Sequence, residues 1–258
     1  MLKIGSIAVD PPIVLAPMAG VTNRAFRQLC RSYGAALYVS EMVSARAAIE
    51  RSPKTSAMMR FGDDEPVRSL QLYGVEPGVV FAAVKYAVQE VGVDHVDLNF
   101  GCPAQKVNKV GGGAALPLHN LLFGRIVAAA VRAAGAVPVT VKMRKGIDDD
   151  TLTYLTAGRV AEDAGVAAIT LHARTAEQLY SGAADWNAIA TLRAAISGVP
   201  VLGNGDIWSA DQAVAMMAQT GCDGVVVGRG CLGRPWLFRE LEDAFDGRPV
   251  TPAPKLGE

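Results

Sequence analysis

The sequence predicts a closed (β/α)8 barrel, the TIM barrel fold, and three observations lead to this prediction. Short apolar segments alternate with amphipathic ones along the whole chain, which is typical of parallel βα units. Eight such units can be counted in 258 residues. Half of the residues are hydrophobic and only 19% are charged, which is enough for one large core.

Each predicted strand is a short apolar run, and each is followed by a predicted helix. After a short N-terminal ribbon, we expect strands at 13–18, 36–42, 67–73, 95–100, 137–144, 168–174, 199–203 and 224–227. We expect helices at 22–31, 44–51, 76–91, 118–134, 149–164, 186–196, 209–220 and 235–245. Thr22 is placed to cap the first helix, and Pro235 suits the first turn of the last one. The barrel should therefore occupy residues 1–245, and residues 246–258 should form a short tail.

A doubly wound sheet is the main alternative to the barrel, and one motif favours it. Residues 228–233 read GRGCLG, which matches the dinucleotide-binding pattern G-x-G-x-x-G between a strand and a helix. That pattern should open a βαβ unit and precede an acidic residue by about 20 positions. Here it follows the last predicted strand, so we reject the dinucleotide interpretation. Glycine N–H groups after the eighth strand of a barrel still predict a phosphate site, at Gly228 and Arg229.

Composition excludes several classes of protein. No apolar run approaches the length of a bilayer span, and the N-terminus lacks an apolar segment of signal-peptide length. The four cysteines are scattered without a Cys-x-x-Cys pair, so neither a zinc site nor a disulfide framework is predicted. We expect a cytoplasmic protein. A formal net charge of zero argues against non-specific coating of nucleic acid but leaves room for a local basic patch.

The segment 95–117, HVDLNFGCPAQKVNKVGGGAALP, has the most unusual composition in the chain. A strand that ends in Gly-Cys-Pro places the thiol of Cys102 at the C-terminal strand tip, where ligands bind in α/β proteins. The proline fixes one backbone angle beside it, and the three glycines at 111–113 allow the next loop to move. Most free cysteines are small buried residues. A basic, glycine-rich loop is a poor place to bury one, so we interpret Cys102 as functional.

In a barrel, the C-terminal strand tips share one face and can converge on one ligand. The tips carry no carboxylate or histidine cluster for a catalytic metal and no Ser-His-Asp arrangement, so no metal site is predicted. They carry amides, glycine turns, a lysine within an apolar strand, a histidine and arginines. This set suits a flat, polar, phosphorylated cofactor across the barrel mouth. In chain order it is Ala16-Pro17-Met18-Ala19-Gly20, Gln71, Asn99, Lys142, His172, Arg174, Asn204-Gly205-Asp206 and Gly228-Arg229.

Several of these residues have a second interpretation that the sequence leaves open. Lys142 is also compatible with a Schiff-base lysine of the kind used by barrel aldolases, or with a surface residue. His172 is equally compatible with a hydrogen-bonded structural histidine. Asn204-Gly205-Asp206 is also compatible with a plain turn.

Six segments resemble the tRNA-dihydrouridine synthases, and the B-type bacterial branch most of all. The combination of N-x-G-C-P, V-K-M-R and G-N-G-D is specific, since dihydroorotate dehydrogenases share the flavin barrel without it. The likeness covers essentially the whole chain. Family members continue into a C-terminal helical domain that helps to hold tRNA, and residues 246–258 would be a remnant or the start of it. The segments are APMAGVTNRAFR (16–27), DLNFGCPAQKV (97–107), VKMRKGID (141–148), LHARTAEQLYSGAADW (171–186), VLGNGDI (201–207) and GVVVGRGCLGRPWLF (224–238).

The resemblance implies a flavoenzyme that holds FMN at the barrel mouth and reduces uridines in the D-loop region of tRNA, with NADPH as reductant. Lys142 would lie by the pyrimidine edge of the flavin, where a cation stabilises the anionic reduced form. The residues implied in cofactor binding are Pro17, Met18, Ala19, Gln71, Lys142, His172, Asn204, Gly205, Asp206, Gly228 and Arg229.

The same resemblance implies that Cys102 is the catalytic acid. Hydride would reach C6 of the uracil from the flavin, and the thiol would protonate C5 from the opposite face. Asn99 and Arg174 would contact the uracil. The target base must leave the RNA stack to enter such a pocket. A basic mouth would help to hold the phosphates of the RNA, and the candidates for it are Lys106, Lys109, Arg144 and Lys145.

Two functions from different classes are therefore compatible with the sequence. The first is an active FMN-dependent reductase of tRNA. The second is a barrel that binds flavin or RNA without turning over tRNA, because the C-terminal docking domain is missing. A lysine-dependent aldolase ranks third, because that reaction has no use for Cys102.

Overall fold

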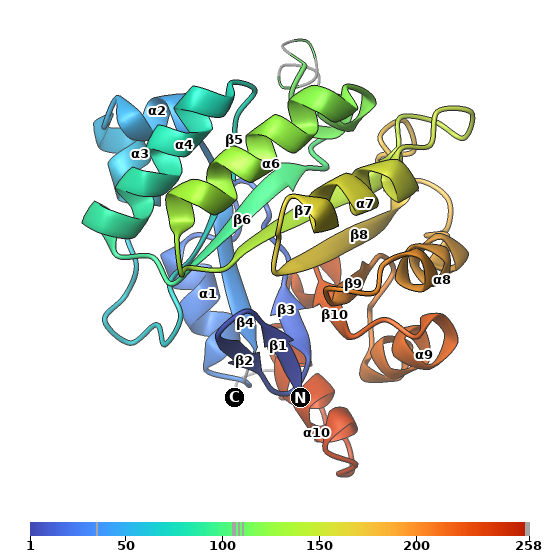
Figure 1. The fold of residues 1–258 in the computed structure, drawn as a ribbon. Helices are drawn as coiled ribbons and strands as arrows, with labels where there is room; N and C mark the ends of the chain where they lie inside the picture. Colours follow the sequence, from blue (N-terminus) through green and yellow to red (C-terminus); the bar gives the residue numbers. More distant parts are fainter. Residues whose placement is uncertain (35, 105–106, 108, 110, 256–258) are drawn as a thin grey trace.

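The computed structural model describes residues 1–34, 36–104, 107, 109 and 111–255. Eight parallel strands of the described chain close into a barrel in the order β10-β3-β4-β5-β6-β7-β8-β9, with the helices on its outside (Figure 1). The strand order follows the chain, as expected for repeated βα units. The predicted TIM barrel is thereby confirmed, and the doubly wound alternative is wrong.

The strands lie close to their predicted positions. The barrel strands are β3 (Ile13–Leu15), β4 (Leu37–Ser44), β5 (Ser69–Tyr73), β6 (His95–Phe100), β7 (Val139–Gly146), β8 (Ala168–Thr175), β9 (Val201–Asn204) and β10 (Gly224–Val227). The N-terminal ribbon is an antiparallel pair, β1 (Leu2–Ile4) and β2 (Ile7–Val9). The strand predicted at 13–18 ends earlier, at Leu15, and residues 16–18 line a pocket instead.

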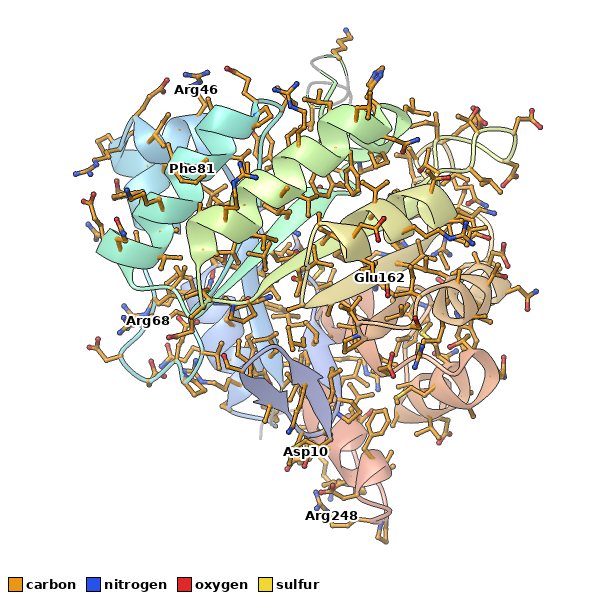
Figure 2. The ribbon with its side chains drawn as sticks, viewed as in Figure 1. Asp10, Arg46, Arg68, Phe81, Glu162 and Arg248 are labelled. Atoms are coloured by element: carbon orange, nitrogen blue, oxygen red, sulfur yellow. The ribbon has the colours of Figure 1, made fainter. Side chains whose placement is uncertain are left out.

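The helices pack around the strands. They are α1 (Arg24–Arg31), α2 (Ala45–Ile49), α3 (Pro53–Met58), α4 (Pro77–Tyr86), α6 (Asn120–Ala134), α7 (Tyr154–Asp163), α8 (Trp186–Ala195), α9 (Ala210–Thr220) and α10 (Leu237–Phe245). A π-helix, η1 (Ala87–Val91), extends α4, and two 3₁₀ helices occur at η2 (Gly113–Leu118) and η3 (Arg229–Cys231). None of the helices in the described ranges has the length and apolar character needed to cross a membrane. Exposed charges such as Arg46 and Arg248 lie at the periphery (Figure 2).

Two predicted helix starts were wrong, in each case because a nearby side chain forms a hydrogen bond with the backbone that the pattern did not indicate. Asn23, rather than Thr22, caps α1, and its Oδ1 accepts the N–H of Phe26 at 3.0 Å. The hydroxyl of Thr22 instead accepts the N–H of Met18 at 3.0 Å and so supports the segment after β3. The helix expected from 149 begins at Tyr154, because Asp148 holds residues 150 and 151 in a turn. Helix α3 was not predicted.

The barrel interior is apolar on one side and polar on the other. Val14, Leu37, Leu202 and Val226 pack against Leu2, Ile4 and Val9 of the hairpin and form an apolar cluster. Strands β5 to β7 instead point buried polar side chains inward, namely Ser69, Gln71, His95, Asp97 and Thr140. Because buried polar groups require partners, this polar side must be hydrogen-bonded internally. A second, larger apolar cluster lies between the strands and the helices.

Candidate active site

An open pocket of about 530 Å³ lies at the C-terminal ends of the barrel strands. It brings together nine of the eleven residues predicted to bind the cofactor, namely Pro17, Met18, Lys142, His172, Asn204, Gly205, Asp206, Gly228 and Arg229. The other two do not line it. Ala19 is exposed on the loop after β3, and Gln71 is fully buried below the mouth.

Glycines bring the loops after β9 and β10 close together at this pocket. A Cβ on Gly230 would lie 2.1 Å from the carbonyl oxygen of Ile207, so only glycine fits there. Gly205 has φ +134° and Asp206 has φ +53°, which turns the chain sharply at the end of β9. Within the described chain, the N–H groups of Gly205, Asp206 and Gly228 form no hydrogen bond with other protein groups. Such free N–H groups in two adjacent turns are suited to an anion.

Lys142 is a half-buried cation on β7. Its Nζ donates to Oδ1 of Asn204 at 2.9 Å, and the Nδ2 of Asn204 donates to the carbonyl of Val226 at 2.6 Å. Burial, and to a smaller extent the charge of Arg144, lower the pKa of Lys142 from 10.5 to about 8, and the charge of Asp97 opposes the change. Lys142 is therefore mostly an ammonium at neutral pH, but its pKa lies within reach of mildly alkaline conditions.

His172 on β8 lies among cations. Burial lowers the pKa of His172, and the charges of Lys142, Arg144 and Arg174 lower it further. The imidazole is consequently neutral at physiological pH, with one ring nitrogen able to donate a hydrogen bond and the other able to accept one.

Two aromatic side chains that were not predicted from the sequence also line the pocket, Tyr180 and Trp208. Their exposed fractions are 54% and 42%. The guanidinium of Arg229 lies 4.3 Å from the ring centroid of Tyr180 and 5.3 Å from that of Trp208. The sequence feature that could have indicated Trp208 as a pocket residue is its position two residues after the G-N-G-D turn. The two rings and Asp206, at 3.8 Å, hold Arg229 at the pocket rim.

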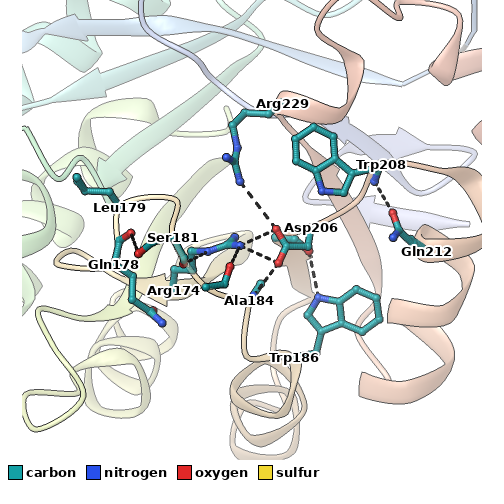
Figure 3. A network of polar contacts seen from close by, with 12 residues as sticks. Arg174, Gln178, Leu179, Ser181, Ala184, Trp186, Asp206, Trp208, Gln212 and Arg229 are labelled. Atoms are coloured by element: carbon teal, nitrogen blue, oxygen red, sulfur yellow. Dashed lines mark hydrogen bonds and ion pairs between the residues drawn. The ribbon is translucent and has the colours of Figure 1, made fainter.

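Arg174 and Asp206 form the centre of a polar network beside the pocket (Figure 3). The Nη2 of Arg174 donates to both carboxylate oxygens of Asp206, at 2.7 and 2.8 Å, and to the carbonyl of Gly182. Asp206 also accepts the N–H of Ala184 at 2.7 Å. The Nη1 of Arg174 is buried and has no partner within the described chain. A ligand contact by Arg174, predicted above for the uracil, would have to use that atom.

Cys102 follows β6 and, of the four cysteines, is the only one that is not buried in the described structure. Its backbone is held from three directions. Oδ1 of Asn99 accepts the N–H of Cys102 at 2.9 Å and that of Gly101 at 3.2 Å. The carbonyl of Gly101 accepts from Nε of Arg144 at 3.0 Å, and the carbonyl of Cys102 accepts the N–H of Ala114 at 3.1 Å. The thiol is therefore presented from a fixed turn.

The predicted basic mouth is only partly present. Arg144 is 4% exposed and donates to the carbonyls of Gly101, Thr175 and Leu179, so it links two loops instead of facing solvent. Lys145 is 8% exposed and pairs with Asp149 and Asp185. Both were wrongly expected to be free for RNA phosphates, because sequence does not show which charges find buried partners. Lys109 is exposed, and Lys106 lies outside the described residues.

No group of three or more His, Cys, Asp or Glu side chains in the described ranges is arranged to hold a metal ion.

Comparisons with known proteins agree on one family. The family model "Dihydrouridine synthase (Dus)" matches residues 14–258. A probable tRNA-dihydrouridine synthase of Mycobacterium tuberculosis (strain CDC 1551 / Oshkosh) is 59% identical over 266 residues, which covers 100% of this chain and 68% of the relative. The tRNA-dihydrouridine synthase B of Pseudomonas aeruginosa is 41% identical and is matched over 99% of this chain and 77% of its own.

Solved structures support the fold independently. Histamine dehydrogenase from Rhizobium sp. 4-9 superimposes with a TM-score of 0.70 at 14% sequence identity, over 95% of this chain and 47% of that one. At this identity the likeness concerns the barrel alone. The family match and the sequence identities, together with the pocket and the Cys102 turn, lead to one assignment: the chain belongs to the dihydrouridine synthase family.

Proposed function

We propose that this protein is a tRNA-dihydrouridine synthase that uses FMN and NADPH to reduce a uridine in the D-loop region of tRNA. The observation that carries the proposal is the pocket itself. It combines two cations, Lys142 and Arg229, with free backbone N–H groups, and Cys102 follows the strand next to that of Lys142. The relatives bear the name tRNA-dihydrouridine synthase, and members of the family are flavin enzymes.

The residues present fit FMN. Its phosphate needs donors, and the free N–H groups of Gly205, Asp206 and Gly228 with the guanidinium of Arg229 supply them. Its flat ring system needs an open slot with few polar groups, and Pro17, Met18 and the neutral His172 line one. We assign the ring to Lys142 and the phosphate to Gly228 and Arg229.

When bound, FMN reduced by NADPH would supply a hydride to C6 of the uracil. Cys102 supplies the proton to C5, so that the C5–C6 double bond gains one hydride and one proton and the thiol is left as a thiolate that solvent reprotonates. The ammonium of Lys142 would stabilise the negative charge of the reduced flavin. Asn99 and Arg144 hold the turn that carries the thiol.

The RNA substrate sets a further requirement on the barrel mouth. The target uridine has to leave the base stack to approach a pocket within the barrel. Because Arg144 and Lys145 are buried, exposed Lys109 and the half-exposed rings of Tyr180 and Trp208 remain to receive the nucleotide.

We place the catalytic barrel at residues 1–245, ending with α10. The residues after it fold back on that helix, since Thr251 donates to Oδ2 of Asp243 through its N–H at 3.0 Å and its hydroxyl at 2.6 Å.

A product assay tests the proposal. Purified protein is incubated with FMN, NADPH and unmodified tRNA transcripts, and the RNA is digested and analysed for dihydrouridine by mass spectrometry. We expect product with the wild type and a strongly reduced yield with Cys102→Ala. A folded, flavin-loaded protein that NADPH reduces but that forms no dihydrouridine would overturn the proposal in favour of a barrel that binds flavin without modifying tRNA.

A further inference from the structure

A continuous chain of hydrogen bonds runs through the polar side of the barrel interior, beneath the pocket. Its members come from three neighbouring strands, and they face one another because Ser69 pairs with His95, Gln71 with Asp97, and Asp97 with Thr140 in the strand registers. All but Asn99 are at most 4% exposed. The six side chains are Ser69, His95, Thr140, Asp97, Gln71 and Asn99.

One arm of this series of hydrogen bonds leads from Ser69, at the far end from the pocket, to Asp97. The hydroxyl of Thr140 donates to Oδ1 of Asp97 at 2.5 Å, so Thr140 must accept from Nε2 of His95 at 3.0 Å. The Nδ1 of His95 is then left to accept from the hydroxyl of Ser69 at 2.8 Å. Burial lowers the pKa of His95 to about 4, and a neutral imidazole has this one-donor, one-acceptor character.

The other arm leads from Asp97 to the Cys102 turn. The Nε2 of Gln71 donates to Oδ2 of Asp97 at 2.7 Å, which leaves Oε1 of Gln71 to accept from Nδ2 of Asn99 at 2.9 Å. Oδ1 of Asn99 is consequently the atom that faces the N–H groups of Gly101 and Cys102. If the amide of Gln71 or Asn99 were reversed, two donors or two acceptors would face each other in a buried site.

A carboxylate can only accept hydrogen bonds, whereas each of the other five side chains in this series of hydrogen bonds can both donate and accept. We propose that Asp97 is a positioning residue for Cys102: its carboxylate is the common end of both arms and sets the direction of each bond up to the Cys102 backbone. The inference rests on the proposed function, in which Cys102 gives up a proton. Among the described residues, neither Asp97 nor the other side chains of this hydrogen-bond chain bond to the thiol, so Asp97 acts only through Gln71 and Asn99.

The charge state agrees with this role. Burial raises the pKa of Asp97 to about 6, while the hydrogen bonds from Thr140 and Gln71 and the charge of Lys142 oppose the change. At pH 7.5 the carboxylate is the main form.

Three variants separate this role from a general effect on packing. Asp97→Asn keeps the size but lets either end of an amide face Gln71, so the direction is no longer imposed. Ser69→Ala is the matched control, because it removes a buried hydrogen bond from the same chain but leaves the arm to Cys102 intact. The double variant Asp97→Asn/Gln71→Glu returns a carboxylate to the arm one position nearer the turn, where it accepts from both the new amide at position 97 and the amide of Asn99.

Two measurements on the 258-residue chain report on the turn without requiring tRNA turnover. The first is the rate at which iodoacetamide alkylates Cys102, which is selective because Cys30, Cys222 and Cys231 are buried. The second is hydrogen exchange of the N–H groups of Gly101 and Cys102. In Asp97→Asn we expect both rates to rise roughly fivefold, the factor for exchanging a charge-assisted bond for a neutral one. Ser69→Ala should stay at the wild-type rates, and the double variant should return close to them.

Wild-type rates in folded Asp97→Asn, or an equal rise in Ser69→Ala, would overturn the inference. Should Asp97→Asn fail to fold, Gln71→Leu cuts only the arm to Cys102 and must show faster alkylation, and wild-type alkylation there would overturn the inference equally. The outcome is independent of the product assay. If no dihydrouridine forms but alkylation follows this pattern, the proposed function fails while the positioning of Cys102 by Asp97 stands.

Discussion

Raising the pH from 7 to 9 should weaken FMN binding, because it removes the proton from Lys142. Burial is the main reason why the pKa of Lys142 falls from 10.5 to about 8, with a smaller contribution from the charge of Arg144. A lysine with a lowered pKa is cationic below that value and loses its charge as the pH rises through it. Any affinity that depends on the ammonium is therefore present at pH 7 and lost above pH 8.

The size of the effect follows from the pKa. A group with a pKa of about 8 is roughly 90% protonated at pH 7 and roughly 10% protonated at pH 9. If only the ammonium form binds the flavin ring, the affinity should fall about tenfold over that range. An ordinary lysine would remain charged throughout, and a phosphate with its second pKa near 6 does not change its charge there.

Titration of flavin-free protein with FMN between pH 6.5 and 9.5, followed by flavin fluorescence, measures this dependence. Lys142→Arg keeps its charge in this range and should show a nearly constant affinity. Lys142→Met should bind weakly and without dependence on pH. A wild-type affinity that is constant up to pH 9.5, or the same decline in Lys142→Met, would refute the reasoning.

Three further predictions concern single side chains. Cys102→Ala should slow oxidation of the reduced flavin by tRNA about 10²–10⁴-fold and leave its reduction by NADPH unchanged. Anaerobic stopped-flow absorbance measures both steps, and equal oxidation rates would remove Cys102 from the mechanism. Arg229→Ala should weaken FMN binding by about 1.5–3 kcal/mol but not that of riboflavin, which lacks the phosphate; equal losses for both in fluorescence titrations would place the phosphate elsewhere. Arg27→Met leaves the carboxylate of Glu65 buried without its cation and should lower the free energy of unfolding by about 3–5 kcal/mol in urea. The exposed pair of Arg46 and Glu76 is the control, since Arg46→Met should cost less than about 1 kcal/mol, and similar losses in the two variants would contradict the reasoning.

The fold could be predicted because its signal is local and repeated. Strands β6 and β10 have the residues that the sequence predicted, since each is a short apolar run that ends at a glycine. Helix starts were predicted less well. At Thr22 and at residue 149, a neighbouring side chain bonded to the backbone more favourably than the pattern suggested. Such competition between local hydrogen bonds is not visible in hydrophobic periodicity.

The candidate site divides in the same way. The sequence alone determined that Lys142, His172, the G-N-G-D turn and Gly228-Arg229 would share one pocket, because the tips of parallel strands in a barrel lie on one face. Only the tertiary structure decided which charges are available there. Arg174 is paired with Asp206, which lies 32 residues further along the chain, Arg144 is buried against two loops, and Asp97 meets Gln71 and Thr140 across strands. These partners follow from strand register and loop packing, and a linear pattern of residue types contains neither.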